Sequence, residues 1–204
     1  MAARFFVNGG VNNLWSSTTN WSTTSGGAGG SSVPAATDDV TLDANSPNCT
    51  VDEGAVRNTL TFTTTNYTNT LTLNGVLRCT STVTLGSSMQ PILGNGAFRW
   101  EGTFNVTTNG ISIPNLGIIN TSTLTFNDAV TVNNVFSVTG TGTITLNGNS
   151  MTVKGFIFIS VIINSAFPTV QGTTIINLNN YNGDYTLVGT LSNTLNIQKP
   201  TRGY

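Results

Sequence analysis

Apolar and polar residues alternate with a period of two along most of this chain. The alternation comes in short runs, namely TLTF (59–62), TLTLNG (70–75), TVTLG (82–86), TLTFND (123–128) and TITLNG (143–148). Strict alternation is typical of strands with one buried face. No window combines helical spacing of apolar residues with good helix formers. The pattern therefore predicts an all-β protein.

The repetition of these runs predicts how the strands are arranged. TLTLNG and TITLNG resemble each other as successive coils of a solenoid would, and most runs end in a single Asn-Gly or Asn-Asp step. Repeated short strands of this kind favour a single-domain parallel β-helix (a β-solenoid). An antiparallel β-sandwich is the alternative, because Asn-Gly is also a strong hairpin signal.

Three segments follow from this interpretation: a cap or docking segment (1–34), a solenoid body (35–198) and a short tail (199–204). Coils of about twenty residues would give the body about eight coils. An open coil end is an unpaired strand edge that has to be covered. The residues that we expect to close the base of the solenoid, or to dock it, are Trp15, Trp21, Pro34, Asp38 and Asp39. The run GGAGG (26–30) between them is expected to be a flexible loop.

The amino-acid composition argues against several classes of function. Only 7% of the residues are charged, the net charge is -1, and there is no His, whereas Thr and Asn number 37 and 27. A chain so poor in charge has no basic field for nucleic acid, and without His it lacks the usual general base and the commonest metal ligand. We therefore expect no catalytic residue, no cofactor and no metal. Ladders of Thr and Asn between stacked coils account for the polar excess.

One acidic cluster and two cysteines leave alternatives open. The cluster is Asp38, Asp39, Asp43, Asp52 and Glu53. Its expected role is to cap backbone N–H groups where the first coil begins; the alternatives are calcium binding and a glycan-cleaving carboxylate pair. Cys49 and Cys79 are expected to be buried thiols, with a disulfide between neighbouring coils as the alternative.

The opening stretch carries a resemblance. Its pattern W…NW…G-G…VP…DDV…DA…CTV, within residues 5–52, resembles the opening of small β-repeat proteins of tailed bacteriophages and environmental viral sequences. Looser versions open the β-helical repeats of bacterial surface proteins and autotransporter passengers. The viral resemblance implies a virion component, such as a fibre, spike or capsid decoration, and frequently a trimer. It brings no catalytic residues with it.

Two further features are candidates for subunit contacts. Trp100 stands between Arg99 and Glu101, which favours a coil corner or a subunit interface over a sugar-stacking site. The run FIFISVII (156–163), with Ser160 as its one polar residue, has large apolar residues on both faces. We expect one face to line the core and the other, with Phe156 and Phe158, to form a contact around a threefold axis. The alternative is an ordinary buried strand under a covering loop.

Together these observations predict a non-enzymatic structural protein of a bacteriophage particle: a capsid decoration, head fibre or tail-fibre module. We expect its partners to be its own copies and other virion proteins, with no nucleic acid and no membrane. It shows neither a secretory signal nor an apolar run long enough to span a membrane, so we expect assembly in the host cytoplasm. The alternatives are a fibre that binds a host-surface glycan, a bacterial adhesin and, least favoured, a glycan hydrolase.

Overall fold

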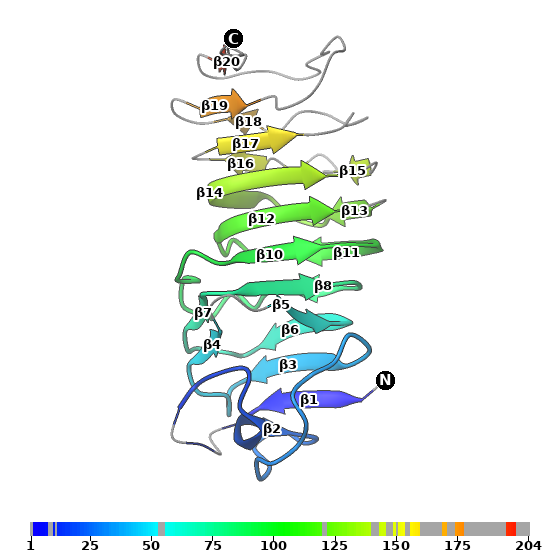
Figure 1. The fold of residues 1–204 in the computed structure, drawn as a ribbon, viewed down its shortest axis with the longest axis vertical. Helices are drawn as coiled ribbons and strands as arrows, with labels where there is room; N and C mark the ends of the chain where they lie inside the picture. The colour runs from blue at the N-terminus through cyan, green and yellow to red at the C-terminus, as the bar shows by residue number, and fades with distance from the viewer. Residues whose placement is uncertain are drawn as a thin grey trace, which may run out of the picture.

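The chain winds into coils stacked along one axis (Figure 1). The structure is a computed structural model, and it describes residues 2–7, 10, 12–52, 56–119, 122–139, 143–145, 149, 151–153, 156–159, 169–170, 174–177 and 195–198. Nearly all its strand pairs are parallel, and about five turns of a β-solenoid are formed. The predicted parallel β-helix is therefore confirmed. The rest of the expected coils fall largely outside the described residues.

Three sheets run along the axis. Sheet A contains, from the base upward, β2 (Trp21–Ser22), β1 (Ala3–Phe6), β3 (Asp39–Asp43), β6 (Thr61–Thr65), β9 (Val83–Thr84), β11 (Thr103–Thr107), β13 (Thr123–Phe126) and β15 (Thr143–Thr145). Sheet B contains β4 (Cys49–Val51) and β7 (Leu71–Leu73). Each lower coil passes from sheet A through sheet B to sheet C.

Sheet C is the longest. It contains β5 (Val56–Thr59), β8 (Val76–Cys79), β10 (Ala97–Trp100), β12 (Ile113–Ile119), β14 (Val130–Thr139), β17 (Phe156–Ile159), β19 (Thr174–Asn177) and β20 (Leu195–Gln198). β16 (Met151–Val153) pairs with the first part of β14, and β18 (Thr169–Val170) pairs with β16. The long β14 pairs with β16 along its first part and with β17 along its second part. Its pairing with β12 contains one register irregularity.

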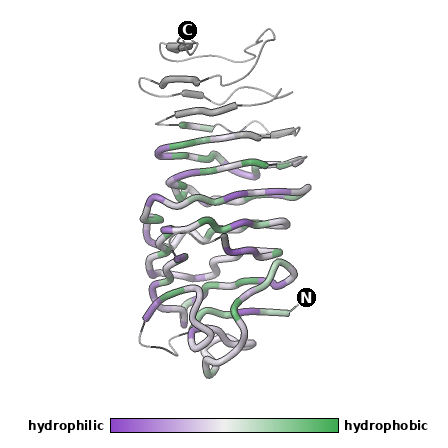
Figure 2. The backbone as a smooth tube through the Cα atoms, viewed as in Figure 1, coloured by the Kyte–Doolittle hydropathy of each residue, from purple (hydrophilic) through white to green (hydrophobic). Residues whose placement is uncertain are grey.

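The register fixes the length of a coil. Val40 pairs with Phe62, Phe62 with Val83, and Val83 with Val106, which are steps of 22, 21 and 23 residues. Equivalent residues therefore stack in columns, and neighbouring strands in such a sheet lie about 4.8 Å apart. Figure 2 shows the resulting change between hydrophilic and hydrophobic residues along each described coil.

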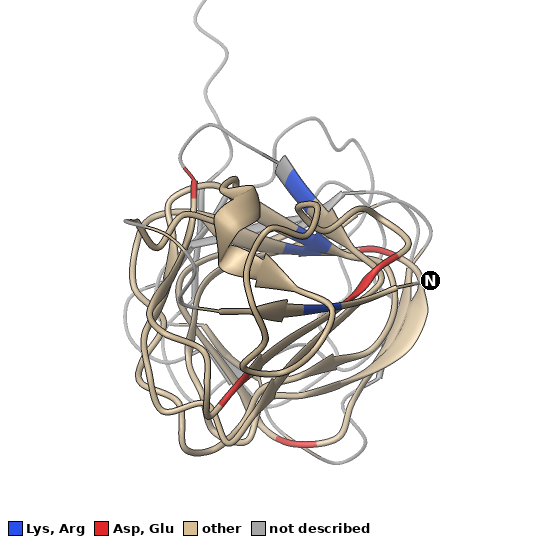
Figure 3. Cartoon of the chain, turned by 90° about the horizontal axis from the view of Figure 1, so that it is seen from below, with Lys and Arg blue, Asp and Glu red and all other residues tan. Residues whose placement is uncertain are grey.

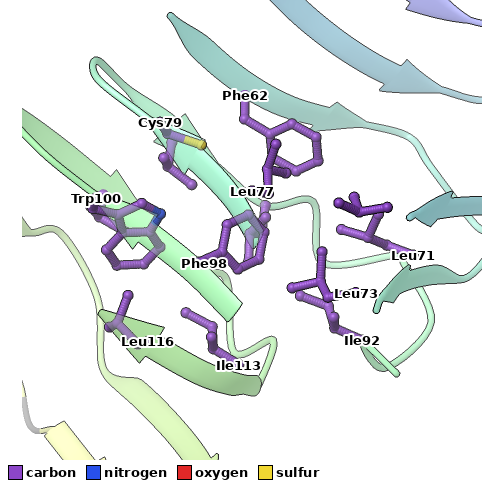
Figure 4. Close-up of a cluster of buried hydrophobic side chains, with 14 of the residues drawn as sticks. Phe62, Leu71, Leu73, Leu77, Cys79, Ile92, Phe98, Trp100, Ile113 and Leu116 are labelled. Atoms are coloured by element: carbon purple, nitrogen blue, oxygen red, sulfur yellow. The ribbon is translucent and has the colours of Figure 1, made fainter. Parts of the chain in front are cut away.

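The core is a narrow apolar column inside the coils. Alternate residues are buried in many of the described strands, and Figure 4 shows side chains from several coils meeting there. Its aromatic rings form a series of neighbours that runs upward from the cap, with centroids 4.7 to 6.3 Å apart: Phe6, Trp21, Trp15, Phe62, Phe98, Trp100 and Phe126. This series joins the coils through side chains as well as through the sheets.

The cap is part of the solenoid from its first strand. β1 pairs in parallel with β3, so that Ala3 lies beside Asp39, and β2 pairs with β1 in the one antiparallel pair of the described strands. Sheet A therefore includes β1, which begins at Ala3, within the segment 1–34 that the sequence assigned to the cap and not to the solenoid body. The described helical structure is a single 3-10 turn, η1 (Thr18–Asn20). No helix in the described ranges is long and apolar enough to cross a membrane.

Candidate functional site: the cap and the outer faces

Trp15 and Trp21 lie at the base of the core, and both side chains are fully buried. Their rings meet edge to face with centroids 4.7 Å apart, and Trp15 also contacts Phe62 of the first full coils. The indole N–H of Trp21 donates to the carbonyl of Trp15 at 2.7 Å. The two tryptophans thus cover the end of the apolar column, which is the place that a cap requires.

Asn20 holds the loop in front of these rings. Its side chain is buried, and its amide donates to the carbonyls of Asn12 (2.7 Å) and Leu14 (3.0 Å). Its own carbonyl accepts the backbone N–H of Val7. No structural role was expected for Asn20 from the sequence, although its position directly before Trp21, in the NW pair, could have indicated that it belongs to the cap.

The Gly-Ser loop is fastened at both ends. Its start is held by the amide of Asn45, which donates to the hydroxyl of Ser25 at 3.0 Å. Its end is held by backbone bonds from Gly30 to Thr18 and from Ser31 to Trp21. Pro34, which follows the loop, is buried. The loop therefore follows a defined path under the base rather than the free path that its composition indicated.

The acidic residues near the base hold backbone groups. The Asp38 carboxylate accepts the N–H groups of Ala2 and Ala35 and lies 3.7 Å from the Arg4 guanidinium. Asp39 accepts the hydroxyl of Thr61. Asp38 thus accepts backbone N–H groups, as the expected capping role requires, whereas Asp39 accepts a side-chain hydroxyl.

The other two described acids of the cluster act in the same way. Asp43 accepts the N–H of Asn45, and Asp52 accepts the N–H of Ser16 and pairs with Arg57 at 2.9 Å. Glu53 lies outside the described residues. Among the described residues, no three His, Cys, Asp or Glu side chains lie close enough together to hold a metal ion.

Electrostatics follow from these contacts. Partial burial by itself would raise the pKa of Asp52, but hydrogen bonds from Ser16 and the charge of Arg57 outweigh it and lower the pKa below its ordinary value. Burial raises the pKa of the Cys49 thiol well above its usual range, with Asp52 adding to the effect, and burial also raises the pKa of Cys79. Both cysteines are free and buried, as the sequence analysis expected. They are inert thiols at neutral pH.

Trp100 corrects one prediction. Its side chain is fully buried between Phe98 and Phe126, so it offers no surface for a subunit contact. Its backbone does end β10, directly before the turn that leads to β11. The neighbouring Arg99 and Glu101 occupy the outer face of sheet C instead. Because side chains alternate along a strand, Trp100 shares the inner face with Phe98.

The outer face of sheet C carries Arg78 and Arg99. Arg78 and Arg99 are direct neighbours on β8 and β10, and Arg78 forms an ion pair with Glu101. Arg99 is exposed and pairs with no described carboxylate, and its aliphatic stem lies against Gly117, where a Cβ would be 3.4 Å away. Figure 3, a view along the axis, shows how few of the described residues are charged.

The run 156–163 is described only over β17. Its backbone register places Phe156 beside Val135 and Phe158 beside Ser137, whereas Ile157 lies beside the buried Phe136. Val135 and Ser137 belong to the outer face of sheet C. The predicted contact through Phe156 and Phe158 therefore continues this face and stays a prediction, because Ser160 and the rest of the run lie outside the described residues.

Asp128 is a further structural residue that the sequence analysis left without a role. Its carboxylate accepts the backbone N–H groups of Thr108 and Asn109 from the coil below, and also the hydroxyl of Thr108. It thus ties two successive coils together at the end of sheet A. Its signal in the sequence is the TLTFND run, where it follows the strand.

Comparison of the chain with protein-family models, with curated proteins and with solved structures finds no match.

Proposed function

We propose that this chain is a non-enzymatic structural protein of a bacteriophage particle, displayed as a capsid decoration, a head fibre or a tail-fibre module. The observation that carries the proposal is where the resemblance falls in the fold. The residues of the W…NW…VP…DDV pattern are those that close the base of the solenoid, namely Trp15, Asn20, Trp21, Pro34 and Asp38. The stretch that resembles the viral openings is thus the stretch that caps this solenoid, and this coincidence supports the proposal.

The mechanism is mechanical. Hydrogen bonds between successive coils run along the axis, and the aromatic series adds side-chain packing in the same direction. Such a stack resists bending and proteolysis because each coil is held by both of its neighbours. The non-enzymatic part of the proposal is supported by the carboxylates of Asp38, Asp39, Asp43 and Asp52, each of which accepts a hydrogen bond from a backbone or side-chain group of the cap or the lower coils.

The particle itself tests this function. Virions purified on a density gradient from the host culture should contain peptides of this chain in a fixed ratio to the major capsid protein, and antibodies against the chain should label intact particles in electron micrographs. Labelling would also distinguish the head from the tail. If the chain stays in the soluble fraction of the lysate and is absent from purified particles, the proposal is wrong.

We also propose that the displayed form is a homotrimer joined through the outer face of sheet C, where Val135 and, by register, Phe156 continue one another. Light scattering of the purified chain should give three copies of the 21.4 kDa chain, about 64 kDa. Val135→Glu places a charge on this face and should yield monomers, whereas Thr72→Glu on the outer face of sheet B should leave the mass unchanged. A stable wild-type monomer at micromolar concentration contradicts the trimer.

A further inference from the structure

The outer face of sheet A is a regular array of threonines. One column along the axis contains Thr41, Thr63, Thr84 and Thr107, which pair directly in register. The adjacent column lies two residues earlier on each strand and contains Thr61, Thr82, Asn105 and Thr125. We call these eight residues the Thr face; Asp39, which pairs with Thr61 at the lower end of the second column, borders it.

The chemistry of the Thr face is uniform. None of its eight residues is charged, and each Thr presents one methyl and one hydroxyl group. Within the described ranges, the hydroxyls of Thr63, Thr82 and Thr84 make no hydrogen bond to the protein, whereas Thr61 donates to Asp39 and Thr107 accepts from Asn127. The middle of the face therefore offers free hydroxyls at repeated positions.

A sugar is not the best match for this surface. Neutral glycans are commonly held by stacking on aromatic rings, but Trp15, Trp21 and Trp100 are all buried. Among the described residues, the exposed large apolar side chains are Leu14 and Leu93, and both lie beside the strands of sheet B. The Thr face has methyl and hydroxyl groups to offer and no ring.

The spacing of the array matches a lattice of hydrogen-bonded water. Its columns repeat every ~4.8 Å across the strands and every ~6.6 Å, or two residues, along these parallel strands. Water molecules joined tetrahedrally at an O···O distance of 2.7–2.8 Å have second neighbours about 4.5 Å apart and a layer repeat of about 7.3 Å along the hexagonal axis. Both repeats of the protein agree with those of the ice lattice to within about a tenth.

We propose that the Thr face binds ice. A rigid array holds many first-layer waters at once, so the entropy lost for each water is small. The methyl groups order the water between the hydroxyls because they cannot hydrogen-bond with it. Liquid water has no fixed lattice, so the agreement between the two spacings favours binding only at the surface of an ice crystal. The inference is independent of the virion proposal, since it concerns the purified chain and a face away from sheet C.

Growth of single ice crystals in a solution of the purified chain tests the proposal. Wild-type protein should produce faceted crystals, a gap between the melting and freezing points that grows with concentration, and inhibition of recrystallisation in a frozen film. Thr84→Lys places a long charged side chain in the middle of the Thr face, between Thr63 and Thr107, and should reduce all three effects to the level of buffer. Thr72→Lys is the matched control, because it makes the same change at an outward position of sheet B.

Both variants are first compared with the wild type by circular dichroism and gel filtration, so that loss of fold is separated from loss of binding. Round crystals and no freezing gap with folded wild-type protein would overturn the proposal. So would equal losses in Thr84→Lys and Thr72→Lys. Binding of the chain to crystalline cellulose or chitin, with no effect on ice, would assign the face to a glycan and would equally refute ice binding.

Discussion

At the scale of single residues, the cap depends on buried polar side chains as much as on its tryptophans. Asn20 bonds to carbonyls eight and six residues before it. Asp38 and Ser46 bond to backbone groups 36 and 40 residues before them; the hydroxyl of Ser46 donates to the carbonyl of Phe6 at 2.6 Å. Buried carbonyl and N–H groups destabilise a fold when they are left unpaired. These side chains therefore specify the path of the cap, and the aromatic rings supply its apolar area.

Asn20→Ala tests whether the buried polar side chains stabilise the cap. The substitution leaves the carbonyls of Asn12 and Leu14 without their donor, and we expect it to lower the free energy of unfolding by about 1–3 kcal/mol. Urea denaturation followed by tryptophan fluorescence would measure the change. The control is Asn134→Ala on β14, where the exposed side chain makes no described hydrogen bond. Equal stability of the two variants would contradict the role given to Asn20.

Asp52 gives the cap a dependence on pH. Its pKa is lowered in the folded state, so the carboxylate contributes stability above its unfolded pKa of about 3.9, and this contribution is lost as the pH falls through the lower folded value. Asp52→Asn should therefore be less stable than the wild type at pH 7, and the difference should shrink steadily below pH ~4. Denaturation curves at several pH values would show it. A difference that does not change with pH would mean that the charge of Asp52 has no part in stability.

At the scale of the strand, the alternation of β10 separates the core from the surface within two residues. Trp100 points into the core against Phe98 and Phe126, and Arg99 beside it is exposed on the outer face. The sequence contained this information, because Phe98 and Trp100 are two residues apart and so share a face. The prediction failed because it gave more weight to the flanking charges of Arg99 and Glu101 than to the period of two.

Two substitutions in β10 compare how much a core residue and a surface residue contribute to the free energy of unfolding. Trp100→Ala leaves a cavity in the core and should lower the free energy of unfolding by about 3–5 kcal/mol. Arg99→Ala changes an exposed side chain, for which an effect of about 0.5 kcal/mol or less is expected. Chemical denaturation of both variants under the same conditions provides the comparison. A loss from Arg99→Ala as large as that from Trp100→Ala would mean that the register of β10 is wrong.

At the scale of the whole molecule, the body of the fold and the tryptophans at its base were predictable, but the first strand of the base and its hydrogen bonds were not. Runs such as TLTF and TITLNG indicate both the strand and its inward face, and their likeness indicates stacked coils. β1 escaped prediction because ARFF (3–6) has no alternation, and its partner β3 comes after a loop and 36 residues later in register. Contacts across such a distance leave no local pattern. Asn20 and Asp38 were equally hard to assign, since their partners lie on other segments.

The cap should prevent further chains from pairing with the base of the solenoid. Without residues 2–33 the lower edge of β3 loses β1, and the rings of Trp15 and Trp21 no longer cover the apolar column. An open strand edge over an exposed core is a template for pairing with another chain. We therefore expect the truncated protein to form species larger than the wild type, with a size that increases with concentration in light scattering.

Trp21→Ala tests the same idea with the chain intact, because it opens the cover and leaves β1 in place. This variant should show the same growth more weakly, and Thr23→Ala, an exposed neighbour, should behave as the wild type. Circular dichroism shows whether the variants retain their β structure. If both the truncated protein and Trp21→Ala keep the wild-type mass and spectrum at all concentrations, then the N-terminal segment is not a cap, and its buried tryptophans serve the stability of the first coil alone.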